Sequence, residues 1–335
     1  MERDLVTGGT GLVGSHIICE LLNHGREVRA VKRSTSNMAH VEFLISNLVD
    51  ENKRGNLEWM NADITDYFSV EDCVQDCSRV FHSAGFVSFV DNHAEKLHAI
   101  HVEGTANIVN ACLAQDEKPI LCHISSTASL GKPSSEVIDE RVLFILSEAD
   151  SEYAKSKYLA ELEVVRGREE GLTAAILNPS IILGFANWDL GSSRFFKNGY
   201  RGFPFYTPGA NSIVDARDVA SAALSLMDYS LYKDRYLCTG TGALFKDVFD
   251  IIARSFGRRP PRFRVRTWMA RLAWQMAGIK RFFGGSSMLT KASALTAMRY
   301  TKYSSEKLIN EANFTFRTLD ECISFHSALY LKFKQ

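Results

Sequence analysis

The residues best suited to chemistry in this sequence are a tyrosine and a lysine four positions apart, Tyr153 and Lys157 in YAKSK. On a helix this spacing places the phenol and the ammonium on one face, a single turn apart. A phenol with an ordinary pKa of about 10 exchanges protons poorly at neutral pH, and a nearby cation favours its phenolate. The hydroxyl of Thr127 can hydrogen-bond the carbonyl oxygen of a substrate that exchanges a proton with Tyr153. These residues predict proton transfer to or from a carbonyl group.

The same spacing recurs at Tyr330 and Lys334, so a tyrosine-lysine pair alone does not identify a site. Neither a glycine-rich turn nor a strand end leads into the second pair. We therefore expect a solvated terminal helix around Tyr330 and assign the chemistry to Tyr153, which follows a buried strand by a loop.

The glycines of the first segment, MERDLVTGGTGLVG, indicate a nucleotide site. Leu5 and Val6 lead into them as an apolar strand, and helical periodicity begins at Leu12. Glycine permits positive φ and lets a pyrophosphate approach the backbone. The unpaired amides at a helix start then attract phosphate. Gly8, Gly11 and Gly14 therefore predict a strand, turn and helix that bind a dinucleotide.

The following segments alternate between strand and helix patterns. Strands are expected at 27–31, 57–61, 79–81, 119–125 and 172–177, with helices at 38–49, 70–77 and 96–114 between them. This alternation predicts an α/β fold with a doubly wound parallel sheet. Ligands bind at the carboxyl ends of the strands in such sheets. The features that follow strands are the glycine turn, Arg33, Asp63, Ser83 to Gly85, and Thr127, so all of them are expected at one edge.

The charge at the end of the second predicted strand bears on the choice of cofactor. An acidic residue there hydrogen-bonds the 2′-hydroxyl of the adenosine ribose, whereas a basic residue accepts a 2′-phosphate. The sequence has Lys32 and Arg33 at this position. NADP is therefore favoured over NAD, with two solvated cations at a strand end as the alternative.

Composition argues against several other classes of protein. The chain has 39 Lys and Arg against 39 Asp and Glu, so no net charge draws it to nucleic acid or an anionic membrane. Its seven cysteines form no C-x-x-C units, which argues against a metal site and favours reduced core thiols. Neither a leader peptide nor an apolar run of membrane-spanning length is expected. The sequence predicts a cytoplasmic protein that acts on a small molecule.

Several motifs resemble those of one enzyme family. TGGTGLVG resembles the TGxxGxxG fingerprint of the extended branch of the short-chain dehydrogenase/reductase family, which is also called the NAD-dependent epimerase/dehydratase superfamily. VFHSAG resembles its V-x-H-x-A-[AG], and YAKSK matches its Y-x-x-x-K. VRAVKRS is closest to the dihydroflavonol reductase and 3-beta-hydroxysteroid dehydrogenase-like group. The resemblance implies a Rossmann-type fold with a smaller C-terminal substrate-binding domain.

The resemblance also assigns roles to residues. It implies catalysis by Thr127, Tyr153 and Lys157. The cofactor-binding residues that it implies are Gly8, Thr10, Gly11, Leu12, Val13, Gly14, Lys32, Arg33, Asp63, Ile64, Ser83, Ala84, Gly85, Ser125, Tyr153, Lys157, Asn178 and Pro179. Within this set Asp63 is expected on the adenine amino group and Ile64 against the ring, while Asp66 caps the next helix.

Two residues depart from the family pattern. His101 stands where an asparagine can hold a water of a proton relay, so we expect a packing histidine there instead. Asn178 replaces the usual arginine of R-P-x-x-[VI]-x-G, in a form seen both in reductase-like members and in sugar-nucleotide epimerases. These two departures from the family pattern do not determine the substrate class.

The alternating pattern stops after Gly184. We expect residues 1–184 to form the cofactor domain, with a segment at about 211–240 returning to it, and residues 185–335 to form mainly the substrate domain. Aromatic residues crowd 185–206 and either line an apolar pocket or pack a core. The basic stretch 258–266 and the apolar spacing of 268–283 suit a domain-packing helix better than a membrane-surface helix. A homodimer is a candidate assembly.

The sequence thus predicts an oxidoreductase that uses NADP, or NAD, to reduce a ketone or aldehyde of a mainly apolar small molecule. One alternative is an NAD-dependent nucleotide-sugar epimerase or dehydratase, whose substrate diphosphate could be bound by Arg194, Arg201 and Arg217. Such redox-neutral enzymes usually retain NAD, whereas NADP suits net reduction. An alternative of another class is a non-catalytic NAD(P)-binding regulatory protein, which would need neither Tyr153 nor Thr127.

Overall fold

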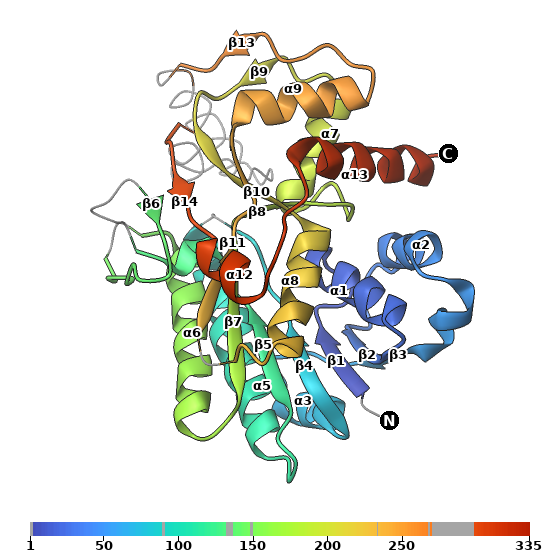
Figure 1. The fold of residues 1–335 in the computed structure, drawn as a ribbon, viewed down its shortest axis with the longest axis vertical. Helices are drawn as coiled ribbons and strands as arrows, with labels where there is room; N and C mark the ends of the chain where they lie inside the picture. The colour runs from blue at the N-terminus through green and yellow to red at the C-terminus, as the bar shows by residue number, and fades with distance from the viewer. Residues whose placement is uncertain are drawn as a thin grey trace.

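A seven-stranded parallel sheet forms the centre of the computed structural model, which describes residues 3–88, 91–131, 137–147, 150–232, 234–266, 269 and 298–335 (Figure 1). The strand order is β11-β7-β5-β4-β1-β2-β3. The strands are β1 (Arg3–Thr7), β2 (Glu27–Lys32), β3 (Leu57–Asn61), β4 (Cys77–His82), β5 (Ile120–Ile124), β7 (Ala174–Pro179) and β11 (Arg235–Cys238). The order reverses between β1 and β4, where the two halves of a doubly wound sheet meet. The predicted Rossmann-type fold is confirmed.

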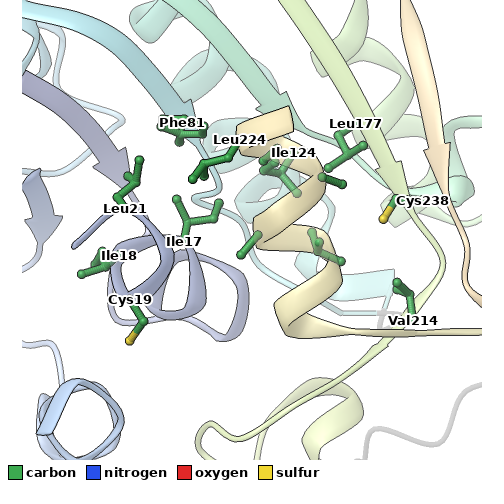
Figure 2. Close-up of a cluster of buried hydrophobic side chains, with 14 of the residues drawn as sticks. Ile17, Ile18, Cys19, Leu21, Phe81, Ile124, Leu177, Val214, Leu224 and Cys238 are labelled. Atoms are coloured by element: carbon green, nitrogen blue, oxygen red, sulfur yellow. The ribbon is translucent and has the colours of Figure 1, made fainter. Parts of the chain in front are cut away.

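Helices cover both faces of the sheet because neighbouring strand residues point alternately to two cores. One core takes Leu5, Val80, Leu121 and Ile176, and the other takes the next residue of each strand, Val6, Phe81, Cys122 and Leu177. The first core is covered by α3 (Tyr67–Val74), α5 (Gly104–Leu113) and α6 (Glu152–Glu169), and the second by α1 (Leu12–Asn23), α2 (Ala39–Leu48) and α8 (Ala216–Asp228). Figure 2 shows Ile17 of α1 and Leu224 of α8 within the second core. Burial on both faces explains the continuous apolar strands of the sequence.

A smaller lobe follows the carboxyl end of β7 and lies above the sheet in Figure 1. Its sheet joins β8 (Ile181–Leu183), β10 (Ala210–Asp215) and β12 (Thr241–Leu244). The other α-helices and β-strands of the described residues, in both parts of the molecule, are α4 (Ala94–His98), β6 (Val137–Ile138), α7 (Arg194–Tyr200), β9 (Phe205–Tyr206), α9 (Phe245–Ser255), β13 (Phe263–Arg264), β14 (Lys302–Tyr303), α12 (Glu306–Glu311) and α13 (Leu319–Phe333). Within the described ranges, none of these helices combines the length and the apolar character needed to cross a bilayer.

Local boundaries differ from the prediction near α3 and α5. Cys77 was expected in a helix but opens β4, because Asp76 takes a φ of 60° and breaks the helical path. Asp66 occupies the N-cap of α3 as expected, yet its side chain makes no capping hydrogen bond. The helix expected at 96–114 is interrupted by a π-helical turn at Ala99–Glu103, which contains His101. Such turns often mark functional sites.

The expectation of a solvated helix around Tyr330 is wrong. α13 packs on α9 and β10, and Tyr330 is buried. Its hydroxyl lies 3.1 Å from the carbonyl oxygen of Gly184 and accepts a hydrogen bond from the Ala186 amide at 3.0 Å. The ring of Trp188 stacks on it, with centroids 5.4 Å apart. The second tyrosine-lysine pair is therefore structural.

The aromatic residues of 185–206 mainly pack a core. Phe185 and Phe196 are fully buried, and both contact the Tyr330 ring. Phe203 is exposed and contacts Phe205 at the edge of the lobe. Core packing is thus the better interpretation for the first part of this stretch. Apart from residue 269, the predicted segment 268–283 lies outside the described residues.

Candidate active site

The glycine turn forms the floor of the candidate cofactor site. Gly8 has a φ of 67°, and a Cβ there would lie 2.7 Å from the Cα of Ala84. A Cβ on Gly14 would lie 2.3 Å from the carbonyl oxygen of Gly8. α1 begins at Leu12 after Gly11 without a side-chain cap, so the amides of its first turn can bind a phosphate group. A side chain at Gly8 or Gly14 would clash with the neighbouring backbone. The turn without side chains leaves room for a pyrophosphate to approach the main chain.

The end of β4 lies against that turn. Ser83 donates a hydrogen bond from Oγ to the carbonyl oxygen of Thr7 at 2.7 Å. Thr7 Oγ1 lies 2.7 Å from His82 Nδ1 and accepts a hydrogen bond from the Ala84 amide at 3.3 Å. These bonds join the ends of β1 and β4 at the point where the strand order reverses. Two motifs distant in the sequence therefore form one surface.

The predicted adenosine end lies across β2 and β3. Arg33 is exposed just after β2, and Asp63 follows the neighbouring strand β3. Hydrogen bonds from Thr65, and then the Arg33 guanidinium, lower the pKa of Asp63. Ile64 is buried against α5, where a Cβ on Gly104 would lie 2.6 Å from its Cδ1. The Lys32 ammonium lies over Trp59, so Arg33 is the more exposed cation at this strand end.

α6 directs Tyr153 and Lys157 toward the end of β5. Lys157 is buried and donates a hydrogen bond from Nζ to the carbonyl oxygen of Ile124 at 3.0 Å. Burial lowers the pKa of Lys157 to about 8, against the opposing influence of Glu161. Burial also raises the pKa of Tyr153. At neutral pH this pair is therefore a protonated phenol beside an ammonium.

The hydroxyl bonded to Tyr153 is that of Ser126, and this hydrogen bond partly offsets the effect of burial on the tyrosine pKa. Thr127 opens the turn at Thr127–Ser129 and hydrogen-bonds the Tyr303 hydroxyl. Tyr303 comes from β14, far along the chain, and nothing in the sequence pattern pointed to it. Ser126 thus joins Thr127 as a candidate for the orienting hydroxyl.

Separate substitutions distinguish the two hydroxyls. Thr127→Val is expected to lower kcat about 10²-fold, because one donor to the carbonyl oxygen is lost. Ser126→Ala is expected to change kcat by only a few fold, because the family resemblance assigns the orienting role to Thr127, whereas the Ser126 hydroxyl bonds Tyr153 and accepts the Ala128 amide at 3.2 Å. Steady-state rates of both variants measure this. A large loss confined to Ser126→Ala would move the role to Ser126.

His101 ties α6 to the end of β4 as a packing residue. Its Nε2 accepts a hydrogen bond from the Phe86 amide at 3.0 Å, so Nδ1 carries the proton and donates to Ser156 Oγ at 2.8 Å. Ser156 in turn donates to the carbonyl oxygen of Tyr153 at 2.9 Å. Burial, with the Lys157 charge, lowers the pKa of His101 to about 2. A neutral histidine therefore fixes the backbone that carries Tyr153.

The side chains of Ser125 and Asn178, both expected at the cofactor, bind a carboxylate that sequence reasoning missed. They donate to Glu161 Oε1 at 2.5 and 2.6 Å. Pro179 is the last residue of β7. Tyr153, Lys157 and Glu161 follow one another at intervals of four on α6, and this spacing was the signal that could have found Glu161.

Two of the arginines considered for a substrate diphosphate already have partners. Arg217 is bound to Asp215, with Nη2 and Oδ2 2.6 Å apart, and stacks on Phe325 at 3.7 Å. Arg194 donates from Nε to the carbonyl oxygen of Asp189 at 2.7 Å. Arg201 is exposed. The described residues thus give weaker support for a diphosphate site than the sequence suggested.

Known proteins resemble this chain over most of its length. Residues 5–230 match the family model described as the NAD dependent epimerase/dehydratase family. Sterol demethylase protein B of Methylococcus capsulatus is 27% identical over 265 residues, which cover 78% of this chain and 76% of the relative. An anthocyanidin reductase of Vitis vinifera is 26% identical over 286 residues, covering 78% and 82%.

A solved structure shares the whole fold. UDP-glucuronic acid 4-epimerase from Bacillus cereus, in complex with NAD, matches with a TM-score of 0.76 and covers 98% of this chain and 96% of its own. Its sequence identity is 15%, so this likeness shows the fold alone.

Proposed function

The chain belongs to the NAD-dependent epimerase/dehydratase family, and we propose that it is an NADPH-dependent reductase of a ketone or aldehyde on a mainly apolar small molecule. At the coarser level it is an NAD(P)-dependent oxidoreductase of the extended short-chain type. The observation that carries the proposal is the common edge of the sheet, where the glycine turn, the end of β4 and the Tyr153–Lys157 pair all lie at carboxyl ends of strands. We assign cofactor binding to residues 1–184, with the segment at about 211–240, which contains α8 and β11, returning to that domain, and substrate binding mainly to residues 185–335.

The residues fit the cofactor in four places. The first-turn amides of α1 would hold the pyrophosphate, Arg33 the 2′-phosphate, Asp63 the adenine and Lys157 the ribose hydroxyls. When bound, the nicotinamide supplies the hydride.

The proton then comes from this chain. Tyr153 donates its phenolic proton to the carbonyl oxygen, so that hydride and proton together give the alcohol. The Lys157 ammonium stabilises the phenolate that remains. The Thr127 hydroxyl orients the carbonyl oxygen.

Reduction is favoured over epimerisation by the charges of the described residues. Arg33 suits the 2′-phosphate of NADPH, which is consumed in net reduction, and Arg217 is already paired with Asp215. The name of the anthocyanidin reductase relative agrees with this choice. The epimerase alternative draws support from the NAD-bound structural neighbour and from the exposed Arg201.

The test of the proposed reductase function is NADPH oxidation with a panel of apolar ketones and aldehydes. Turnover with them supports the reductase, and turnover confined to nucleotide sugars contradicts it.

Arg33→Ala is expected to weaken NADPH binding by about 10- to 100-fold and NADH binding by less than about twofold. A charge-assisted hydrogen bond, worth about 1.5–3 kcal/mol, is lost only with the 2′-phosphate. Fluorescence titration of both cofactors measures the difference. Lys53→Ala is the control, because it removes an ammonium that precedes β3 and donates to the Asn23 carbonyl, away from the carboxyl end of β2. Equal losses for both cofactors in Arg33→Ala would exclude a 2′-phosphate contact.

A further inference from the structure

We infer that Glu161 is a positioning residue of this site: its buried carboxylate, paired with Arg235, holds the turn at residues 125–129 and the end of β7 beneath Tyr153 and Lys157. The inference rests on the proposed reductase function and extends its machinery to Glu161 and Arg235.

One oxygen of Glu161 binds three side chains from two segments of the chain. Oε1 accepts hydrogen bonds from Ser125 Oγ at 2.5 Å, Ser129 Oγ at 2.5 Å and Asn178 Nδ2 at 2.6 Å. Asn178 Nδ2 also lies 3.2 Å from the carbonyl oxygen of Ser126. The turn held in this way carries both candidate orienting hydroxyls, those of Ser126 and Thr127.

The other oxygen of Glu161 forms a buried ion pair. Oε2 lies 2.9 Å from Nη2 of Arg235, and the glutamate side chain is only 1% exposed. Burying a carboxylate this deeply is costly unless a cation pairs with it. Asn178 contributes only an amide, and β11, which pairs with β7, supplies the guanidinium. The network therefore crosses three neighbouring strands under the site.

Glu161 is also the negative charge that acts on Lys157. Besides Tyr153, the other titratable groups of the described residues that interact with Lys157 are three histidines: His82 on β4, His101 in the π turn and His123 on β5. Burial lowers the pKa of all three histidines, to about 3 for His82 and about 2 for His101, so they are neutral at and above neutral pH. Arg235 and Arg168 act on Glu161 as positive charges. Glu161 thus favours the charged form of Lys157, which burial disfavours.

The pH dependence of the rate follows from these charges. Lys157 has a pKa of about 8, so its ammonium is present below that pH and lost as the pH rises through it. Without the carboxylate the pKa of Lys157 falls further. The alkaline limb of the pH–rate profile is then expected to move to lower pH by about 1 unit.

The test substitutes Glu161→Gln, which keeps the shape and removes the charge. We expect kcat to fall about 10-fold or more at pH 8, with the alkaline limb shifted to lower pH. The pH at which NADPH affinity declines should shift in the same direction. Glu163→Gln is the matched control on the same helix, since Glu163 pairs with Arg166 at the surface. It should leave both profiles unchanged.

The double variant Glu161→Gln with Arg235→Met guards against a folding failure, because it also removes the charge that the single variant leaves buried. A uniform loss of kcat without movement of the limb would overturn the inference, as would an unchanged profile. Failure of both variants to fold would also overturn it, since Glu161 would then be a folding element only.

The measurement separates the inference from the proposed function. If the wild-type protein reduces no carbonyl compound, the reductase proposal fails. The pH dependence of NADPH affinity needs no substrate and still decides the role of Glu161.

Discussion

Replacing Tyr153 with phenylalanine is expected to lower kcat by about 10²- to 10⁴-fold while the affinity for NADPH stays nearly unchanged. The substitution removes one phenolic oxygen and keeps the ring that lies 5.7 Å from the His101 ring, so the fold of α6 should persist. The lost proton donor leaves the developing alkoxide without its partner. Stopped-flow and steady-state rates, together with NADPH titration, measure both quantities.

Tyr330→Phe is the matched control, because it removes the hydroxyl from the other tyrosine-lysine pair. That hydroxyl accepts the Ala186 amide in the core of the smaller lobe. We expect an unchanged kcat and a loss of roughly 1 kcal/mol in the free energy of unfolding. Wild-type turnover by Tyr153→Phe would refute the proton-donor role.

Gly14→Ala is expected to weaken NADPH binding about 10²-fold and to abolish turnover at ordinary cofactor concentrations. The new Cβ would lie 2.3 Å from the Gly8 carbonyl oxygen and 2.8 Å from Ser83 Oγ. The backbone must move, at a cost of about 1–3 kcal/mol, and the turn that receives the pyrophosphate moves with it. Fluorescence titration gives the affinity, and circular dichroism shows whether the sheet is intact.

Gly55→Ala serves as the control for this glycine, because a Cβ there meets nothing within 4 Å and Gly55 lies in the short helical turn Glu51–Asn56. Its NADPH affinity should equal that of the wild type. If Gly14→Ala also binds NADPH with wild-type affinity, the turn is not the pyrophosphate site.

The fold and the shared edge of the site could be predicted because their signals are local. Apolar strand runs, glycines before a helix and the four-residue spacing on α6 each lie within a short stretch, and the strand-end rule then combines them. Gly8, Gly14, Ser83 and Ala84 meet as the sequence implied.

The errors concern contacts between distant segments. Tyr330 is buried because it packs against the aromatic core of the smaller lobe. The residue pattern of α13 alone does not reveal this packing. Tyr303 reaches Thr127, and Arg235 reaches Glu161, only after β14 and β11 have been placed. The side chains of Ser125 and Asn178 turn toward Glu161 for the same reason, since a buried carboxylate recruits the donors around it. Their predicted contacts with the cofactor remain predictions.

Net reduction of a carbonyl group by NADPH can be measured directly from the balance between cofactor and product. The purified protein is mixed with a known amount of NADPH and an apolar ketone or aldehyde that it accepts, and both oxidised cofactor and alcohol are quantified. We expect one NADP⁺ to be released for each alcohol formed. Tightly held NAD that copurifies, and that is found again in its starting state after a nucleotide sugar has been converted, would contradict it.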